Sequence, residues 1–278
     1  MLRFSKCHAY GNDFLYVLRD AVGGAALDEL AREMCDRHTG IGADGLIVYA
    51  RTADGASMRL FNADGSRAEV SGNGVRGLAA LLVRDDDAGR ARAGEPMAAG
   101  VTLTVGTEGG VKRLARTGSA GIRQTFRASM GLPVGLRQVA VAAAGETVTA
   151  VVLTLGNPQC VVLGALPEEE RFRRLGAALE RHELFPEGTN VEFARVDAPG
   201  RVTIRIWERG VGPTSSSGTG SCAALVAAAA FGGAARDAEV VSPGGAQRVE
   251  WLDDSVYLTG WAEVVCDGEW LRPLPSGQ

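Results

Sequence analysis

The chain has 278 residues, which fits two ordinary domains, and its contents of 46% hydrophobic and 22% charged residues are those of a soluble globular protein. The formal net charge of −4 argues against a nucleic-acid-binding surface, and no apolar stretch is long enough to cross a membrane. The N-terminus has no apolar signal-peptide core, so we expect a cytoplasmic protein with neither nucleic acid nor membrane as a partner.

The cysteines and histidines do not form a recognisable framework. The five cysteines are scattered and include no CxxC pair, and the three histidines have no metal-ligand spacing. We therefore expect neither a disulfide framework nor a metal site.

Strand patterns dominate the chain, and four helices are expected among them. β-Branched residues predict strands over 101–105, 147–155 and 202–207, and a hairpin formed by 248–252 and 256–260. Apolar spacing predicts helices over 27–37 and 169–182, and two more helices after the glycine-rich loops described next. Residues 85–100 are rich in charge and are expected to form an exposed loop.

Two short loops resemble each other, one in each half of the chain. One reads Ser71-Gly72-Asn73-Gly74 and the other Ser217-Gly218-Thr219-Gly220, and each leads into a run of small apolar residues. A glycine-rich turn that opens a helix directs backbone N–H groups and a positive dipole end at one point. This pattern predicts two anion-binding helix N-termini, although a serine there is also an ordinary helix N-cap.

The repeated loops predict two similar halves. We place the N-terminal domain at 1–115, with a C-terminal strand at about 264–278 packing back onto it, and the C-terminal domain at 116–263.

Several polar turns accompany the serine loops. Asn12 and Asn157 follow glycines, Asn190 follows Gly-Thr, and Glu208 and Arg209 end a hydrophobic strand. Each asparagine alone is typical of a turn, but a charged pair beside an anion-binding loop suits a carboxylate ligand.

In order along the chain, these segments resemble the diaminopimelate epimerase family of cofactor-independent amino-acid racemases and epimerases. The resemblance runs nearly end to end, through residues 4–14, 35–46, 61–66, 72–76, 156–158, 188–191, 208–210 and 218–220.

The resemblance implies an α/β (α+β) fold with two pseudo-symmetric domains, each a mixed sheet or barrel around a central helix, and an active site in the interdomain cleft. It also implies stereoinversion at the α-carbon of an amino acid, without cofactor or metal, by a homodimer in lysine and peptidoglycan precursor synthesis. One residue at the start of each central helix removes or returns the α-proton, and these positions are Ser71 and Ser217. The substrate-binding positions carried over from the family are Asn12, Asn62, Gly72, Asn73, Asn157, Asn190, Glu208, Arg209, Gly218 and Thr219.

The departures from the family pattern are concentrated around proton transfer. The family has cysteine where this chain has Ser71 and Ser217, histidine where it has Gln159, and Gly-Glu-Thr where it has Gly212-Pro213-Thr214. A thiol can be tuned to a thiolate at a helix N-terminus, whereas a serine hydroxyl acts as a base only beside another base.

Three interpretations follow. The chain is an epimerase that uses its serines, a divergent isomerase or dehydratase with a carboxylate base, or a catalytically silent amino-acid-binding protein. A laboratory double Cys-to-Ser replacement is disfavoured because Gln159 and Pro213 also depart from the family. Glu208, Asp64 and His8 are candidate substitute bases, whereas Cys7, Cys160 and Cys222 are expected to be core residues.

Overall fold

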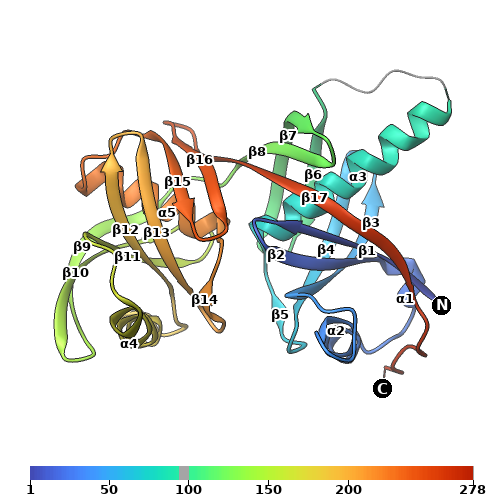
Figure 1. Ribbon diagram of the computed structural model, residues 1–278, viewed down its shortest axis with the longest axis horizontal. Helices are drawn as coiled ribbons and strands as arrows, with labels where there is room; N and C mark the ends of the chain where they lie inside the picture. The colour runs from blue at the N-terminus through green and yellow to red at the C-terminus, as the bar shows by residue number, and fades with distance from the viewer. Residues whose placement is uncertain (94–99, 278) are drawn as a thin grey trace. The chain divides into compact units, whose positions relative to one another are not determined.

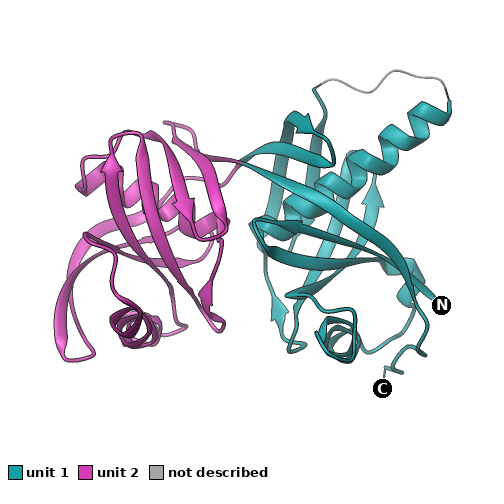
Figure 2. Ribbon diagram, viewed as in Figure 1, with its two compact units in different colours: residues 1–128, 260–278 teal, residues 129–259 magenta. Residues whose placement is uncertain are grey.

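The computed structural model describes residues 1–93 and 100–277, which divide into two compact units (Figures 1 and 2). Unit 1 contains residues 1–128 and 260–278, and unit 2 contains residues 129–259. In each unit, strands surround one helix that begins directly after a serine loop. These helices are α3 (Gly72–Arg92) and α5 (Gly218–Phe231).

Unit 1 is built from two short outer helices, α3 and a mixed sheet. The outer helices are α1 (Arg19–Val22) and α2 (Leu27–Cys35). The strands are β1 (Leu2–Ala9), β2 (Asn12–Leu18), β3 (Gly45–Thr52), β4 (Gly55–Asn62), β5 (Arg67–Ala68), β6 (Thr102–Thr107), β7 (Gly110–Ala120), β8 (Arg123–Ser129) and the end of β17 (Val256–Trp270). The pairing β1–β2 is antiparallel, β2–β3 parallel, β3–β4 antiparallel, β4–β6 parallel, and β6–β7 and β7–β8 antiparallel.

Unit 2 repeats this topology strand for strand. Its strands are β9 (Val134–Ala143), β10 (Glu146–Thr154), β11 (Pro158–Leu163), β12 (Asn190–Ala198), β13 (Arg201–Glu208), β14 (Gly212–Thr214), β15 (Asp237–Ser242), β16 (Gly245–Trp251) and the start of β17, with the outer helix α4 (Glu169–Glu180). The series β10, β11, β12, β13, β15, β16 and β17 has the same alternation of antiparallel and parallel pairs as the series β1 to β8 of unit 1. The predicted pseudo-symmetry and α+β class are therefore confirmed.

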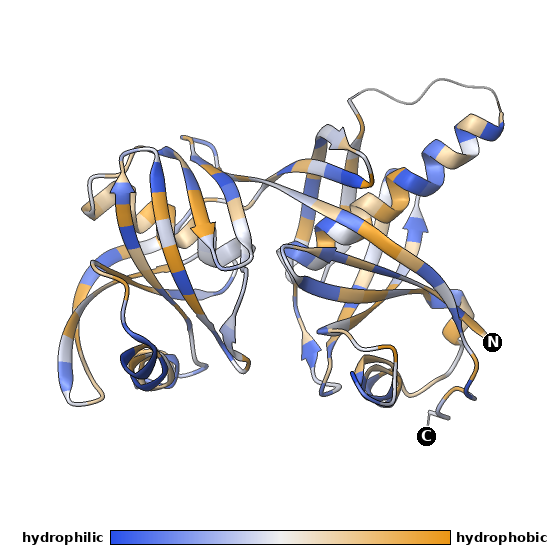
Figure 3. Ribbon diagram, viewed as in Figure 1, coloured by the Kyte–Doolittle hydropathy of each residue, from blue (hydrophilic) through white to orange (hydrophobic). Residues whose placement is uncertain are grey.

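The small apolar residues after each serine loop are explained by burial on every side of the helix. In α5, each residue from Cys222 to Ala228 is fully buried, and in α3 the run from Leu78 to Val83 is buried in the same way. A helix that is apolar all round belongs in a core, and side chains as small as alanine let strands approach it closely. Along the surrounding strands, hydrophobic and hydrophilic residues alternate (Figure 3), as in β13, where Val202, Ile204 and Ile206 face inward.

The predicted helices and strands are present, and most of their ends differ by a few residues, but the strand predicted over 256–260 continues to Trp270 as β17. The expected loop over 85–100 is wrong for its first part, because α3 continues to Arg92. Asp85 and Asp86 pair with Arg51 of β3, and Asp87 pairs with Arg116 of β7, so this charged segment is held as a helix against the sheet. Residues 94–99 lie outside the described residues. No helix in 1–93 or 100–277 is long and apolar enough to span a membrane.

The units divide after Ala128 and after Thr259, whereas the sequence analysis places the boundaries at 115/116 and 263/264. The difference arises because β8 pairs with β7 and with β17, which keeps residues up to Ala128 in the sheet of unit 1.

Candidate functional site

Each predicted catalytic serine is the N-cap of a central helix. The backbone of Ser71 is extended, and its Oγ accepts a hydrogen bond of 3.1 Å from the N–H of Gly74. Ser217 has the same conformation, and its Oγ accepts from the N–H of Gly220, also at 3.1 Å. The two loops are thus equivalent in structure as well as in sequence. We call the predicted residues around Ser71 the first half-site and those around Ser217 the second half-site.

The first turn of each helix offers backbone donors. The N–H groups of an opening turn have no intrahelical carbonyl to bind, and the helix dipole places partial positive charge at the same end. Gly72 and Asn73 occupy this turn in α3, and Gly218 and Thr219 occupy it in α5. Either helix start is therefore suited to a carboxylate group.

Asparagine side chains join the first half-site to strand β2. Asn73 is buried, and its Nδ2 donates to Asn12 Oδ1 at 3.2 Å, while its Oδ1 accepts from the buried guanidinium of Arg76. Asn12 Nδ2 in turn donates to Asp44 Oδ2 at 2.8 Å. These bonds fix the position of both predicted asparagines beside the start of α3. Asn62 is not part of this network, since its Nδ2 donates to Ser66 Oγ at 2.9 Å within its own turn.

An ion-pair network supports Asn12 from behind. Asp13 Oδ1 lies 2.7 Å from Arg37 Nη2 and its Oδ2 lies 2.8 Å from Lys6 Nζ. Arg37 Nη2 also donates to Asp44 Oδ1 at 2.8 Å. Burial works against the charged form of Asp13, but the hydrogen bonds from Arg37 and Lys6 outweigh it and lower the pKa of the carboxyl. The polar segment over 35–46 thus positions Asp44 against Asn12.

A buried amide network forms the second half-site. Gln159 lies on β11 beside Asn190 of β12, and both side chains are buried. The Gln159 amide is oriented by its neighbours: its nitrogen donates to Glu192 Oε1 and Oε2 at 3.0 and 3.3 Å, and its oxygen accepts from Asn190 Nδ2 at 3.2 Å. In this orientation the Gln159 oxygen lies 2.6 Å from the end of the Asn157 amide, which donates to it when its nitrogen is turned toward Gln159. The structure therefore brings Asn157 and Asn190 together around Gln159.

The charged pair at the end of β13 is held by the same network. The backbone N–H of Arg209 donates to Asn190 Oδ1 at 2.9 Å. Glu180 of α4 accepts from Trp207 Nε1 at 2.7 Å and from the N–H of Gly210 at 2.9 Å. Glu208 and Arg209 are thereby fixed between two anchored residues, which favours a preorganised site.

Four of the five cysteines are core residues. All five thiols are free, and Cys7, Cys35, Cys160 and Cys222 are buried, as expected for the three that the sequence assigns to the core. Burial raises the pKa of the Cys35 and Cys160 thiols to about 12 and that of Cys7 further still. A thiol in this state carries almost no thiolate at neutral pH.

Two of the substitute bases have other partners. His8 Nε2 lies 2.7 Å from Glu263 Oε1, and its ring packs edge-on against Trp261. Asp64 accepts hydrogen bonds from the hydroxyl and the N–H of Ser66, which lower the pKa of its carboxyl and weaken it as a base. Both residues have structural roles within unit 1.

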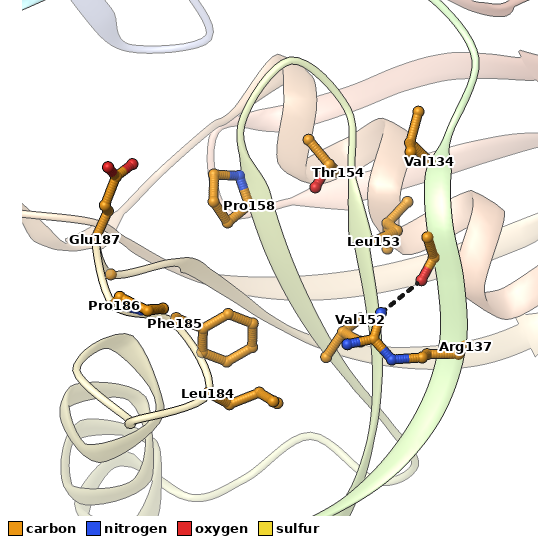
Figure 4. Close-up of a pocket in the computed structure, with 12 residues that line it drawn as sticks. Val134, Arg137, Val152, Leu153, Thr154, Pro158, Leu184, Phe185, Pro186 and Glu187 are labelled. Atoms are coloured by element: carbon orange, nitrogen blue, oxygen red, sulfur yellow. Dashed lines mark hydrogen bonds between the residues drawn. The ribbon is translucent and has the colours of Figure 1, made fainter.

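Unit 2 contains a cavity of about 420 Å³ (Figure 4). Some of its lining residues neighbour residues of the second half-site in the sequence. Its walls come from β9, β10 and the segment 184–188. None of the predicted site residues lines it, but Pro158 and Gly188 do, and they neighbour Asn157 and Thr189 in the chain. The cavity is therefore separate from the serine loop.

Sequence reasoning missed Asp44 and Glu192. Asp44 lies between glycine-rich turns, where an acidic residue is common. Glu192 lies in the run Asn190-Val-Glu-Phe193, and its five-residue stretch of β12 is buried on both faces. A lone carboxyl inside such an apolar strand was the available signal.

Comparisons with known proteins identify the family of the chain. The family profile described as diaminopimelate epimerase matches residues 4–122 and 151–265. A diaminopimelate epimerase from Desulforudis audaxviator is 41% identical over 290 residues, covering 98% of this chain and 100% of that protein. Another from Desulfitobacterium hafniense is 38% identical over 292 residues, covering 98% and 99%.

Solved structures share the fold at low sequence identity. A probable proline racemase from Agrobacterium radiobacter has a TM-score of 0.71 at 17% identity, covering 98% of this chain and 93% of the other. A predicted epimerase from Pseudomonas aeruginosa has a TM-score of 0.69 at 16% identity, covering 98% and 100%. With a family profile that spans most of both units and relatives at about 40% identity over nearly the full length, the chain belongs to the diaminopimelate epimerase family, whose members are isomerases.

Proposed function

We propose that this chain inverts the α-carbon of LL- or meso-diaminopimelate, or of a related amino acid, without a cofactor. The single observation that carries the proposal is the repetition of one half-site: a serine N-cap, a glycine-opened helix and a fixed asparagine occur at the equivalent place in both units. Stereoinversion needs one group that removes a proton from one face of a carbon and another that returns a proton to the opposite face. Two half-sites of equal build suit this demand.

The substrate groups are assigned by charge. The helix starts of α3 and α5 suit carboxylate, and Glu208 suits an ammonium group. Asn12, Asn62, Asn73, Asn157, Asn190 and Arg209 supply further hydrogen bonds in this proposal. Loss of an α-proton produces an enolate, which fixed backbone N–H donors stabilise more than they stabilise the ground state.

The relatives support diaminopimelate as the first substrate to test, because those named above carry the name diaminopimelate epimerase. The same names support a place in lysine and peptidoglycan precursor synthesis. We further propose that the protein is cytoplasmic and forms a homodimer, and sedimentation of the purified chain tests the dimer.

The serines distinguish this chain from the thiol chemistry of its family. A hydroxyl is a much weaker acid than a thiol, so Ser71 and Ser217 need assistance from a neighbouring group to exchange protons. A catalytically silent amino-acid-binding protein is the second candidate, favoured by the use of both hydroxyls as helix caps.

Exchange of the α-hydrogen in deuterated water tests the two candidates. An epimerase incorporates deuterium at the α-carbon of LL- or meso-diaminopimelate, and calorimetry measures binding in the same samples. Binding without exchange, across diaminopimelate and a panel of other amino acids, would establish the silent binding protein instead.

The paired variant Ser71→Cys/Ser217→Cys tests the remainder of the site. If the ligand-holding residues are those of an epimerase, the two thiols raise the exchange rate because they ionise near neutral pH. Each single variant is the matched control, since one thiol supplies only one face.

A further inference from the structure

The two half-sites are alike in backbone but differ in one buried side chain. Phe14 of β2 pairs with Gly45 of β3, and the equivalent strands of unit 2 pair Gln159 with Asn190. Two residues further along β3 and β12 stand Ile47 and Glu192. The topological repeat therefore places an isoleucine in one unit where the other has a glutamate.

Both side chains face the third residue of their central helix. A Cβ added to Gly74 would lie 2.8 Å from Ile47 Cδ1 and 3.6 Å from Ser71 Oγ. A Cβ added to Gly220 would lie 2.6 Å from Glu192 Oε1 and 3.1 Å from Ser217 Oγ. The Glu192 carboxyl and the Ser217 hydroxyl thus both lie close to one empty Cβ position, whereas a methyl group occupies the corresponding place beside Ser71.

The surroundings of Glu192 make its carboxylate a stronger base than that of an ordinary glutamate. The side chain is fully buried, and burial followed by the negative charge of Glu208 raises its pKa well above the usual range. Gln159 donates to both of its oxygens, and the positive end of α5 lies on its helix side. General bases work best when they titrate near the working pH.

We propose that Glu192 is the proton reservoir of Ser217, and that the two serines are consequently unequal. The inference rests on the proposed function and deepens it. In the step that removes the α-proton, the bond between carbon and hydrogen breaks and the proton passes to Ser217 Oγ. The hydroxyl proton of Ser217 passes to the Glu192 carboxylate, and the electron pair stays on the substrate as the enolate. Return of the proton runs through the same groups in reverse.

Glu192 acts through Ser217 and does not touch the substrate, so it is a positioning residue. It accepts the Ser217 proton in one direction and returns it in the other. Ser71, backed by the Ile47 methyl group, has no carboxyl at the equivalent place. The second half-site should therefore set the pH dependence of exchange.

The first experiment compares Glu192→Gln with Glu146→Gln. Glu146 is a carboxyl of the same unit that pairs with Arg171 and Arg174 on the surface. We expect Glu192→Gln to lower α-hydrogen exchange by ~100-fold or more and to remove one ionisation from its pH profile, with ligand binding retained. Glu192→Asp keeps an ionisation, and Glu146→Gln keeps the full rate. An unaltered pH profile in Glu192→Gln, whatever its rate, would overturn the proposal.

A second experiment measures the effect of Glu192 on ionisation at residue 217 and does not depend on catalysis. In Ser217→Cys, the rate of iodoacetamide alkylation at residue 217, followed by peptide mass spectrometry, reports ionisation of the thiol. Adding Glu192→Gln should move this pH profile to lower pH, because an ionised carboxylate beside a thiolate repels it. The matched control is Ser71→Cys, whose profile should be the same with and without Glu192→Gln.

The exchange and alkylation measurements distinguish failure of the epimerase proposal from failure of the Glu192–Ser217 coupling. If the unaltered chain exchanges no α-hydrogen but the profile at residue 217 responds to Glu192, the epimerase proposal fails and the proton coupling stands. If residue 217 does not respond to Glu192, the coupling is refuted even in an active enzyme.

Discussion

The phenolic oxygen of Tyr16 lies 2.8 Å from the carbonyl oxygen of Gly74 and donates its hydrogen bond into the first turn of α3. A Cβ on Gly77 would overlap the same hydroxyl, so Tyr16 of β2 fits into a notch that the missing side chain leaves. This contact ties the helix that carries Ser71 to the strand that begins with Asn12.

We expect Gly77→Ala to destabilise the protein by about 1–3 kcal/mol, because the added methyl group overpacks against a fully buried tyrosine. Gly89→Ala, in the same helix with open space around it, should instead stabilise by about 0.5–1 kcal/mol through helix propensity. Urea unfolding measures both. Equal effects of the two substitutions would contradict the packing argument.

The N-cap role of the serines gives a prediction on stability. Ser71→Ala and Ser217→Ala should each lower the free energy of unfolding by about 1 kcal/mol, since each removes the acceptor of a first-turn N–H. The corresponding glycine variants should lose less than half of what the alanine variants lose. Chemical unfolding measures the loss, with Ser119→Ala on the exposed part of β7 as the control. If either alanine variant matches this control, the hydroxyl has no capping role there.

Gly74 and Gly220, the third residues of α3 and α5, should differ in their tolerance of alanine. In Gly220→Ala, the methyl group meets a buried carboxyl that Gln159 holds in place, whereas in Gly74→Ala it meets the flexible end of Ile47. We expect Gly220→Ala to cost about 1–3 kcal/mol and Gly74→Ala to cost less. Thermal unfolding of the two variants measures both losses of stability. In Gly220→Ala, the shorter Glu192→Asp should recover part of the loss, and an additive pair would argue against contact.

Acid stability should depend on Asp36, whose carboxylate accepts from the N–H groups of Thr39 and His38. These bonds lower its pKa to about 2, below the value in the unfolded chain. The folded state therefore gains stability from Asp36 above about pH 4 and loses it as the pH falls toward 2.

Asp36→Ala should be less stable than the unaltered chain at pH 7, and the difference should shrink between pH 4 and pH 2. Asp253→Ala, in a fully exposed turn, is the control. Unfolding midpoints in urea, taken at intervals of pH, measure both. A difference that is constant with pH would show that Asp36 acts through packing.

Local sequence was sufficient for part of the secondary structure and for the repeat, whereas strands such as β7, β9 and β12 were not predicted. The strands with alternating residues, such as Val202–Trp207, and the two serine-capped helices could be predicted because local sequence determines them. The segment Asp85–Arg92 could not, since its helical state depends on Arg51 and Arg116, which are distant in sequence. Tertiary ion pairs override a loop-like composition.

For the site, the polar turns could be identified but their partners could not. Asn12 and Asn73 are far apart in the chain, and only the pairing of β2 with α3 makes them neighbours. Glu192 could be noticed only as a lone carboxyl in an apolar strand, because its position opposite the helix glycine Gly220 depends on the fold.

Strand β17 has a consequence for the order of synthesis. Its first residues, up to Thr259, pair with β16, and residues from Glu263 onward pair with β1 at the other end of the chain. The first 128 residues therefore leave the ribosome without the strand that completes their sheet, whereas residues 129–259 are contiguous. The later-made half can close first, and the N-terminal half must wait with an open edge at β1 until the last residues of β17 arrive.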